Sequence, residues 1–352
     1  MGSVIIGSGR ALPARIVTND ELSEIVDTTD EWIVPRTGIH IRHVAIEETC
    51  TDLGAQAALR ALGLEEGGWQ REAGAIEAAS LDMIICPTLT ADTHFPSEAA
   101  RIRERIGATN AVCYDMSCAC SGCVYGLSTA DLIMAGAAFA RQEAARTRTP
   151  LRCNDVRRVL VVAAERLSKL VDWEERATCI LFGDGAAAAV YRATEDDNLG
   201  IQSTFIAADG SGAEYLRMEA LPVEDPFAED RTVDPKARFL KMQGAAVVRF
   251  TARAVPQAID TALQRAGITA DDIDWVVPHQ ANLRILDVIA RRYHLPKEKV
   301  YVNMDRFGNT SSASVPICLN EMRRNGLLRE GQTIVCTGFG GGLTYGAFVL
   351  KL

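Results

Sequence analysis

The chain has 352 residues, a length that suggests two domains or one large α/β unit with a substantial core. Its hydrophobic content of 48% comes without an apolar run near 18 residues, which argues against a membrane-spanning helix. The net charge of -9 argues against a nucleic-acid binder, so an acidic partner must meet a local basic patch.

The N-terminal segment "MGSVIIGSGRALP" predicts a first β-strand. Its apolar run is too short for a signal-peptide core, and no basic region precedes it. Ile6 stands where myristoylation requires Ser or Thr, so we expect a cytoplasmic location. A dinucleotide-binding loop is disfavoured as well, because Leu12 occupies the position of the third glycine.

The segment "TDEWIVPRTGI" predicts a capped helix with acidic residues in its first turn. Trp32 and Arg36 lie four positions apart and therefore share one face of this helix. An indole there can stack on adenine, and a guanidinium can bind phosphate. The same pattern is also typical of an ordinary amphipathic helix.

Two stretches, residues 63–80 and 138–158, have many charges and no consistent apolar stripe. We interpret both as surface excursions without a role in chemistry.

The segment "DMSCACSGCVYG" holds Cys118, Cys120 and Cys123, and the chain has ten cysteines in all. In a reducing cytoplasm disulfides are not expected, and buried free thiols are the ordinary interpretation. A zinc site would need a fourth ligand and turn-rich flanks, whereas the flanks read as a strand and a helix, so no metal is expected. Cys120 stands at this strand-to-helix junction, where the helix N-terminus favours a thiolate nucleophile.

Internal repetition is the main indication of the fold. "SLDMIICPT" (80–88) and "DIDWVVPHQ" (272–280) share a strand followed by a Pro-marked loop. "AVCYDMSCACSGCVYGLSTADLIM" and "VYVNMDRFGNTSSASVPICLNEM" each predict a strand, a turn and a helix, and "RRVLVVAAE" with "CILFGDGAAAAVY" matches "QTIVCTGFGGGLTYGAFVL". We predict a five-layer α/β fold from two duplicated halves, residues 1–198 and 199–352.

The duplication places four features in corresponding loops: Cys120, "PHQANLRI" (278–285), "FGNTSSASVP" (307–316) and "GFGGGLTYG" (338–346). Taken singly, His279 is interpretable as a loop histidine bonded to backbone and Asn309 as a turn former. Together they predict one cleft shared by both halves.

In these features the chain resembles β-ketoacyl-acyl carrier protein synthase III, a condensing enzyme of the thiolase superfamily. The resemblance covers nearly the whole chain, from "TDEWIVPRTGIHIRH" through "HFPSEAARI", "ERATCILFGDGAAAAV" and "FLKMQGAAVVRF" to the glycine motif. The two excursions and the cysteines at 118 and 123 depart from the family pattern.

The resemblance implies a thiolase-like αβαβα fold and a catalytic triad of Cys120, His279 and Asn309. Acetyl-CoA or a related acyl-CoA would acylate Cys120, with backbone N–H groups of Cys120 and Gly341 as the oxyanion hole. Malonyl-acyl carrier protein would then lose CO₂, with His279 and Asn309 donating to the enolate oxygen. The CoA thioester is a substrate, and no cofactor is implied.

The resemblance also implies binding roles and a homodimer. It assigns CoA binding to Trp32, Arg36, Arg176 and Asn282. Phe95 would cross the dimer interface to close the partner's acyl pocket, or it is an ordinary core aromatic. Docking of the acidic carrier protein would use Arg249, Arg253 and Arg284.

Four other functions compete with this interpretation, and the protease among them is set aside. A papain-like protease shares the Cys, His and Asn order but has a signature that is absent here. A starter-unit synthase of polyketide or quinolone type, or an acyltransferase, would keep the same triad. A non-catalytic metal module is the rival of a different class, and metal analysis would expose it. Acyl preference cannot be inferred from this sequence.

Overall fold

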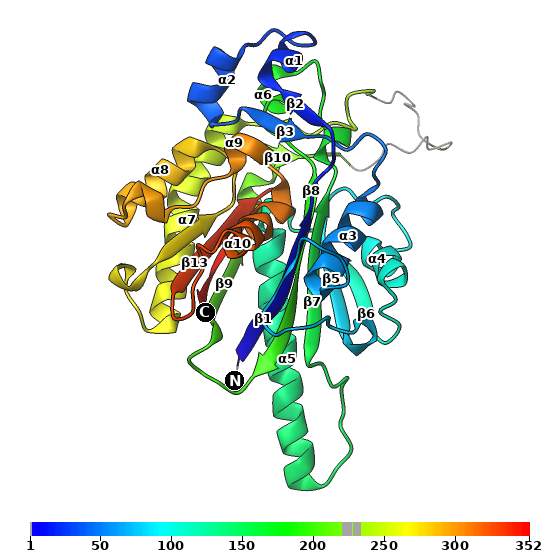
Figure 1. The fold of residues 1–352 in the computed structure, drawn as a ribbon. Coiled ribbons are helices and arrows are strands. Elements are labelled where there is room, and N and C mark those ends of the chain that lie inside the picture. The colour runs from blue at the N-terminus through cyan, green and yellow to red at the C-terminus, as the bar shows by residue number, and fades with distance from the viewer. Residues whose placement is uncertain (1, 220–226, 228–233) are drawn as a thin grey trace.

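Two mixed β-sheets organise the chain (Figure 1). The structure is a computed structural model and describes residues 2–219, 227 and 234–352. The first sheet has the order β4-β1-β8-β7-β5-β6, with strands Gly2–Ala11 (β1), Trp69–Gln70 (β4), Met83–Pro87 (β5), Val112–Met116 (β6), Arg158–Glu165 (β7) and Gly185–Thr194 (β8). The second has the order β12-β13-β14-β9, with strands Gly200–Ala208 (β9), Trp275–Pro278 (β12), Thr333–Gly340 (β13) and Thr344–Lys351 (β14).

The two sheets repeat one topology. In the first, β5 lies parallel to β6 and β7, and β8 pairs antiparallel with β7 and β1. In the second, β12 lies parallel to β13, and β14 pairs antiparallel with β13 and β9. The predicted duplication is therefore confirmed. The division at residue 198 stays a prediction.

One predicted strand is wrong. The segment "VYVN" should have formed a strand equivalent to β6, but it makes a single parallel bridge between Val276 and Val300. Beyond this bridge the backbone N–H groups of Asn303 and Met304 donate to the Gln280 side chain, at 3.0 and 3.3 Å. These bonds satisfy the backbone outside the sheet, so the ladder ends.

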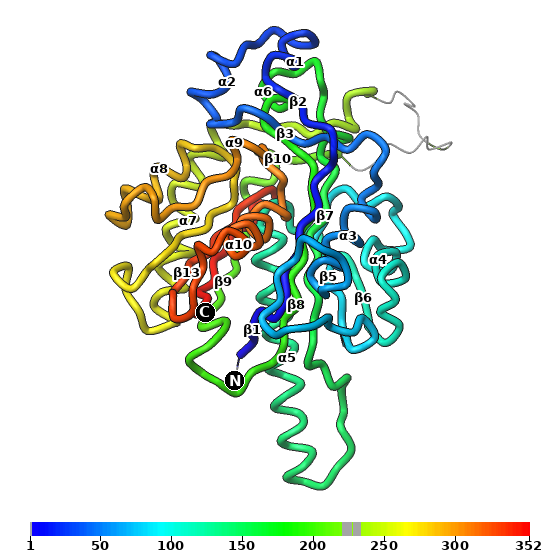
Figure 2. The backbone as a smooth tube through the Cα atoms, in the orientation of Figure 1, coloured from blue at the N-terminus to red at the C-terminus, as the bar shows by residue number. Residues whose placement is uncertain are grey.

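The helices complete five layers, as predicted (Figures 1 and 2). The outer face of the first sheet carries Cys50–Leu62 (α3) and Glu98–Ile106 (α4). Between the sheets lie Gly122–Thr147 (α5) and Ser314–Arg324 (α10), and α5 contacts strands of both halves. The second sheet is covered by Gly244–Ala266 (α7), with Leu283–Arg292 (α8) packed on α7.

Short elements gather at one end of the molecule, at the top of Figure 1. They are Ile16–Thr18 (β2), Asn19–Ser23 (α1), Asp30–Thr37 (α2), Ile41–His43 (β3), Arg176–Cys179 (α6), Leu216–Arg217 (β10), Lys241–Met242 (β11) and Met304–Phe307 (α9). Helix α2 has the predicted start, because the Thr29 side chain accepts from the backbone N–H of Trp32 at 3.2 Å.

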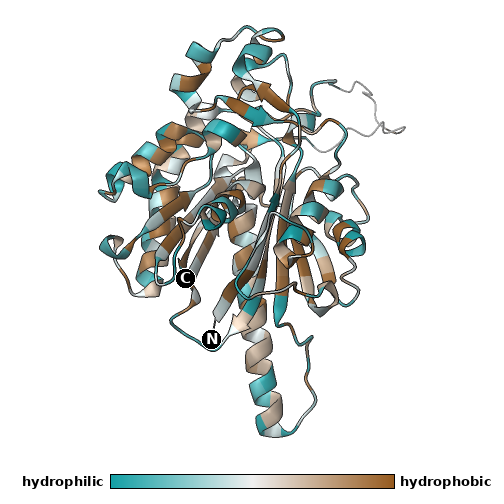
Figure 3. Cartoon of the chain, in the orientation of Figure 1, coloured by the Kyte–Doolittle hydropathy of each residue, from teal (hydrophilic) through white to brown (hydrophobic). Residues whose placement is uncertain are grey.

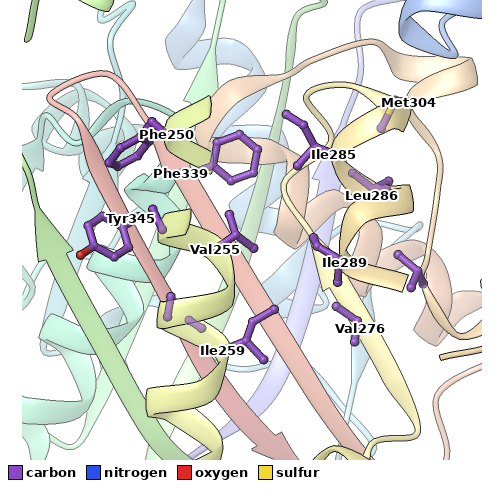
Figure 4. Packing of buried hydrophobic residues seen from close by; sticks show 14 of the residues in the cluster. Phe250, Val255, Ile259, Val276, Ile285, Leu286, Ile289, Met304, Phe339 and Tyr345 are labelled. Atoms are coloured by element: carbon purple, nitrogen blue, oxygen red, sulfur yellow. The ribbon is translucent and has the colours of Figure 1, made fainter. Parts of the chain in front are cut away.

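Apolar side chains are buried between the layers, and Figure 3 shows hydrophobic residues along the strands of both sheets. Figure 4 shows one such cluster, where residues of α7 and α8 pack on β12, β13 and β14. Small residues let α5 approach the first sheet closely. A Cβ at Gly126 would lie 3.0 Å from side-chain atoms of both Pro87 and Val161. The small-residue helix is thus a packing requirement of the middle layer.

The two predicted surface excursions contain more regular structure than expected. Within residues 63–80, Trp69–Gln70 forms the edge strand β4 beside β1. Within residues 138–158, α5 continues to Thr147. Alanines and the Glu143 to Arg146 ion pair favour the helix there, although no apolar stripe marks it.

Among the described residues, Ala119–Thr147 has the length and hydropathy that could cross a membrane, contrary to the sequence analysis. Half of its apolar window is buried inside the protein. A helix packed between two sheets can have the same length and hydropathy as a membrane-spanning helix.

Candidate active site

A cavity of about 1240 Å³ lies between the two halves. Cys120, His279 and Asn309 all line it, so the structure brings the predicted triad into one cavity. Residues of both halves complete its walls, and many of them are apolar, including Leu181, Leu216 and Met242. A largely apolar cavity with a few convergent polar groups is the usual form of a small-molecule site.

Cys120 lies in a single 3₁₀ turn, Ala119–Ser121, directly before α5. The predicted strand-to-helix junction is therefore confirmed. A Cβ at Gly340 would lie 2.5 Å from the backbone nitrogen of Cys120, so only glycine fits there. Gly341 also lines the cavity, and a Cβ added to it would lie 3.0 Å from the carbonyl oxygen of Leu216. The close approach of a glycine to Cys120 is thus made by Gly340, and the role of Gly341 in the oxyanion hole stays a prediction.

Burial opposes the predicted thiolate character of Cys120. Burial is the main cause that raises the pKa of its thiol to about 12; the nearby Glu165 carboxylate also raises it, and a contact with Ser311 lowers it. A thiol with this pKa is protonated near pH 7.

His279 directly follows β12, and its backbone N–H donates to the Thr337 carbonyl at 2.8 Å. Its ring nitrogen Nδ1 lies 2.7 Å from Ser314 Oγ, so the ring does not bond to backbone there. The Phe339 ring packs edge-on against it, with centroids 5.1 Å apart. Burial lowers the pKa of the imidazole to about 3, which keeps the ring neutral near pH 7.

Asn309 belongs to the second half and is bonded to the first, because its backbone N–H donates to the Leu181 carbonyl at 2.8 Å. Its side-chain oxygen accepts from the backbone N–H of Ser311 at 2.9 Å. The amide NH₂ group is therefore the end left to donate into the cavity. Ser311 has a φ of 49°, a strained conformation for a side-chain-bearing residue and typical of functional sites.

Sequence reasoning missed several polar residues around the triad. Ser311 and Ser314 stand inside the quoted asparagine motif, and Gln280 follows His279, yet none received a role. Gln280 bonds Pro278 and Tyr301 through its NH₂ group and so fixes the loop. Glu165 is fully buried and accepts from Leu89 and Thr90. Only their three-dimensional neighbours distinguish these residues.

The expected CoA-binding residues lie close together around α2, at the end of the molecule that carries the short elements. The guanidinium groups of Arg36 and Arg176 lie 4.4 and 4.3 Å from the Trp32 ring centroid. Arg36 and Asn282 line the cavity. The Asn282 amide already donates to the Arg36 carbonyl at 2.8 Å and accepts from Arg284 N–H at 2.9 Å. Asn282 thus caps α8 and ties it to α2.

The expected docking arginines are all exposed, but they differ in their partners. Arg284 lines the cavity, and Arg249 lies on α7 next to the lining residue Val248. Arg253 forms an ion pair with Asp209 at 3.0 Å. The interpretation of Phe95 as a core aromatic is wrong, because its side chain is 86% exposed.

The sequence profile described as "3-Oxoacyl-[acyl-carrier-protein (ACP)] synthase III" matches residues 146–210, and its C-terminal counterpart matches residues 263–352. The beta-ketoacyl-[acyl-carrier-protein] synthase III of Clostridium acetobutylicum is 39% identical over 352 residues, covering 100% of this chain and 99% of that protein. The chain belongs to this synthase III family.

Solved structures agree with this assignment. The 3-oxoacyl-[acyl-carrier-protein] synthase III of Aquifex aeolicus VF5 has a TM-score of 0.84 and 37% identity, with 100% of both chains covered. The priming beta-ketosynthase of the R1128 polyketide pathway has a TM-score of 0.81 and 36% identity, covering 99% of this chain and 96% of that one. The synthase III profiles include His279 and Asn309, and Cys120 lies within the full-length match.

Proposed function

We propose that this protein condenses an acyl-CoA primer with malonyl-acyl carrier protein, giving 3-ketoacyl-acyl carrier protein, CO₂ and CoA, and so initiates fatty acid synthesis. The observation that supports this most is the placement of Cys120, His279 and Asn309 on one cavity in a chain of this family. The proposed setting is the cytoplasm. The reaction needs no cofactor, because the CoA thioester is itself a substrate.

In the first half-reaction Cys120 Sγ attacks the thioester carbonyl of the acyl-CoA. The backbone N–H groups of Cys120 and Gly341 would donate to the tetrahedral oxyanion. The C–S bond to CoA then breaks, and the proton from Cys120 ends on the CoA sulfur. The acyl group remains on Cys120 as a thioester.

In the second half-reaction malonyl-acyl carrier protein occupies the same cavity. Loss of CO₂ leaves an electron pair as an enolate on its thioester. His279 and the Asn309 NH₂ group would donate hydrogen bonds to this oxygen. The enolate carbon attacks the acyl-Cys120 carbonyl, and Cys120 leaves and regains a proton.

The nucleotide of CoA would bind beside α2 and α6. Trp32 offers a ring for the adenine, and Arg36 and Arg176 offer charge for phosphates. The Asn282 amide already bonds to the backbone of Arg36 and Arg284, so we assign Asn282 the role of fixing α2 and α8 relative to each other. Contact with the pantetheine arm remains its second proposed role.

A homodimer is part of the proposal. Strand β6 is an edge of the first sheet among the described strands, and Val112 on it is 41% exposed. An unpaired edge is a ready surface for strand addition. The exposed Phe95 ring would enter the partner subunit and close the partner's acyl pocket. The preceding residue, His94, lines the cavity of its own chain.

A turnover panel tests the function. Acyl-CoA primers of different length and branching would be offered with malonyl-acyl carrier protein, and with malonyl-CoA as the competing extender. We expect 3-ketoacyl-acyl carrier protein from at least one short primer. Phe95→Ala should accept longer primers, because the proposed stopper is removed. Absence of product from every primer would contradict the proposal.

A starter-unit role in polyketide synthesis is the second candidate. It is favoured by the similarity to the R1128 priming beta-ketosynthase, whose 36% identity to this chain is close to the 37% of the Aquifex aeolicus synthase III. The same triad would act in both, so the panel distinguishes them through the preferred primer and carrier protein.

Arg249→Glu or Arg284→Glu is expected to raise the KM for malonyl-acyl carrier protein by about 3- to 10-fold and to leave acyl-CoA loading nearly unchanged. The net charge of -9 offers no long-range attraction for an acidic partner, so local cations must supply it. The defect should grow as salt is lowered, because the reversed charge is screened less. Kinetics across ionic strength measure this.

Arg253→Glu should have a smaller effect, because Asp209 already pairs with Arg253. Arg291→Glu is the matched control, since Arg291 is exposed at the far end of α8 and does not line the cavity. Equal KM values in the Arg249, Arg284 and Arg291 variants would place docking on another surface.

A further inference from the structure

The His279 imidazole is held by Ser314, the first residue of α10. The atoms Nδ1 and Ser314 Oγ lie 2.7 Å apart, and the two residues are only 1% and 2% exposed. The chemistry proposed above uses His279 as a hydrogen-bond donor but does not explain which ring nitrogen carries the hydrogen. The Ser314 contact decides this point.

The hydrogens around Ser314 can be counted. A hydroxyl has one hydrogen to donate and two lone pairs to accept. The backbone N–H of Gln280 donates to Ser314 Oγ at 3.3 Å and uses one lone pair. Within the described part of the chain, the recorded acceptor for the hydroxyl hydrogen is His279 Nδ1. A hydrogen on Nδ1 would instead leave the buried hydroxyl hydrogen without an acceptor, which is unfavourable.

We infer that Ser314 is a positioning residue that donates to Nδ1 and holds His279 as the tautomer with its hydrogen on Nε2. For its catalytic consequence this inference rests on the proposed function, which it deepens. A neutral ring of this tautomer can donate from Nε2 to a thioester oxygen. It has no free lone pair on Nε2, so it cannot accept the Cys120 proton there.

Two further contacts support a fixed ring. The edge-on packing of Phe339 restricts its rotation, and burial keeps the imidazole neutral. Asn309 is fixed in a parallel way, because its oxygen accepts from Ser311 N–H. Ser311 therefore donates to the acceptor atom of Asn309, and Ser314 donates to that of His279. Both donating ends are set before substrate enters, as electrostatic preorganisation requires.

Nuclear magnetic resonance of protein with ¹⁵N-labelled histidine rings tests the tautomer directly in the absence of substrate. The chain has five histidines, and the His279 signals are those lost in His279→Gln. We expect a hydrogen on Nε2 and none on Nδ1 in the wild-type protein. A hydrogen on Nδ1 would overturn the inference, even if Ser314 variants fail to fold.

Ser314→Ala should populate both tautomers and slow malonyl decarboxylation by about 10- to 100-fold, the range seen for partners that orient metal-bound histidines. Ser314→Thr keeps the hydroxyl and should restore the Nε2 hydrogen. Ser128→Ala is the matched control, because Ser128 is a buried serine of α5 outside the cavity lining.

A Ser314→Ala protein that keeps the wild-type tautomer and decarboxylation rate would contradict the positioning role. Because the spectra are recorded on the free protein, they decide the tautomer even if malonyl-acyl carrier protein is not the substrate. Failure of the proposed function and failure of this inference are thus separate results.

Discussion

Cys120→Ser is expected to reduce acyl transfer from acetyl-CoA by on the order of 10³-fold or more, in the range seen when an enzyme loses its nucleophile. A serine hydroxyl is far less ionised than a thiol, and it is a weaker nucleophile toward thioesters. The effect should be large here because burial already holds the pKa of the Cys120 thiol at about 12. The same burial would also raise the pKa of a serine hydroxyl, which is already a much weaker acid than a thiol.

Mass spectrometry after incubation with acetyl-CoA measures this. The wild-type protein should carry one acetyl group on the peptide that contains Cys120. Cys118→Ser is the matched control and should acylate normally, because the contacts recorded for Cys118 with Ser121 and Thr344 use its carbonyl oxygen. Acetylation of Cys118 or Cys123 with Cys120 free would overturn the assignment.

His279→Ala or Asn309→Ala should each slow malonyl decarboxylation by about 10² to 10³-fold, the usual loss for one oxyanion donor. Acyl loading should suffer less, because the proposed oxyanion hole for that step consists of backbone N–H groups. The two half-reactions can be followed separately, by release of CO₂ from malonyl-acyl carrier protein and by acylation of Cys120.

Equal losses in both half-reactions of His279→Ala would point instead to His279 as the base that activates Cys120. That result would contradict the donor role proposed for His279, whereas the tautomer itself is decided by the spectra of the free protein. Asn309→Asp is a useful companion, because it keeps the size of the side chain and removes the NH₂ donor. It should be as defective in decarboxylation as Asn309→Ala.

Much of the fold could be predicted because it depends on local patterns. The apolar runs at "MIICP" and "TIVCTGFG" predicted β5 and β13, and recurrence of the same units predicted the duplicated layers. The prediction of secondary structure failed where contacts with residues distant in the sequence determine the local conformation. The strand expected at "VYVN" is replaced by bonds to Gln280, and residues 138–147 are helical without an apolar stripe.

The active site divides in the same way. Cys120, His279 and Asn309 were identifiable because each stands in a recognisable local motif. The sequence did not reveal the raised pKa of the Cys120 thiol, since this depends on how completely distant segments exclude water.

The sequence by itself predicted the two repeated sheets and the side chains proposed to react, because strand and helix patterns and motif residues are local properties of the chain. Only the tertiary structure decided their protonation and orientation. The Ser314 contact with His279 spans 35 positions, and the cavity walls come from both halves. Desolvation and hydrogen bonding depend on which atoms meet in space, so no local pattern encodes them.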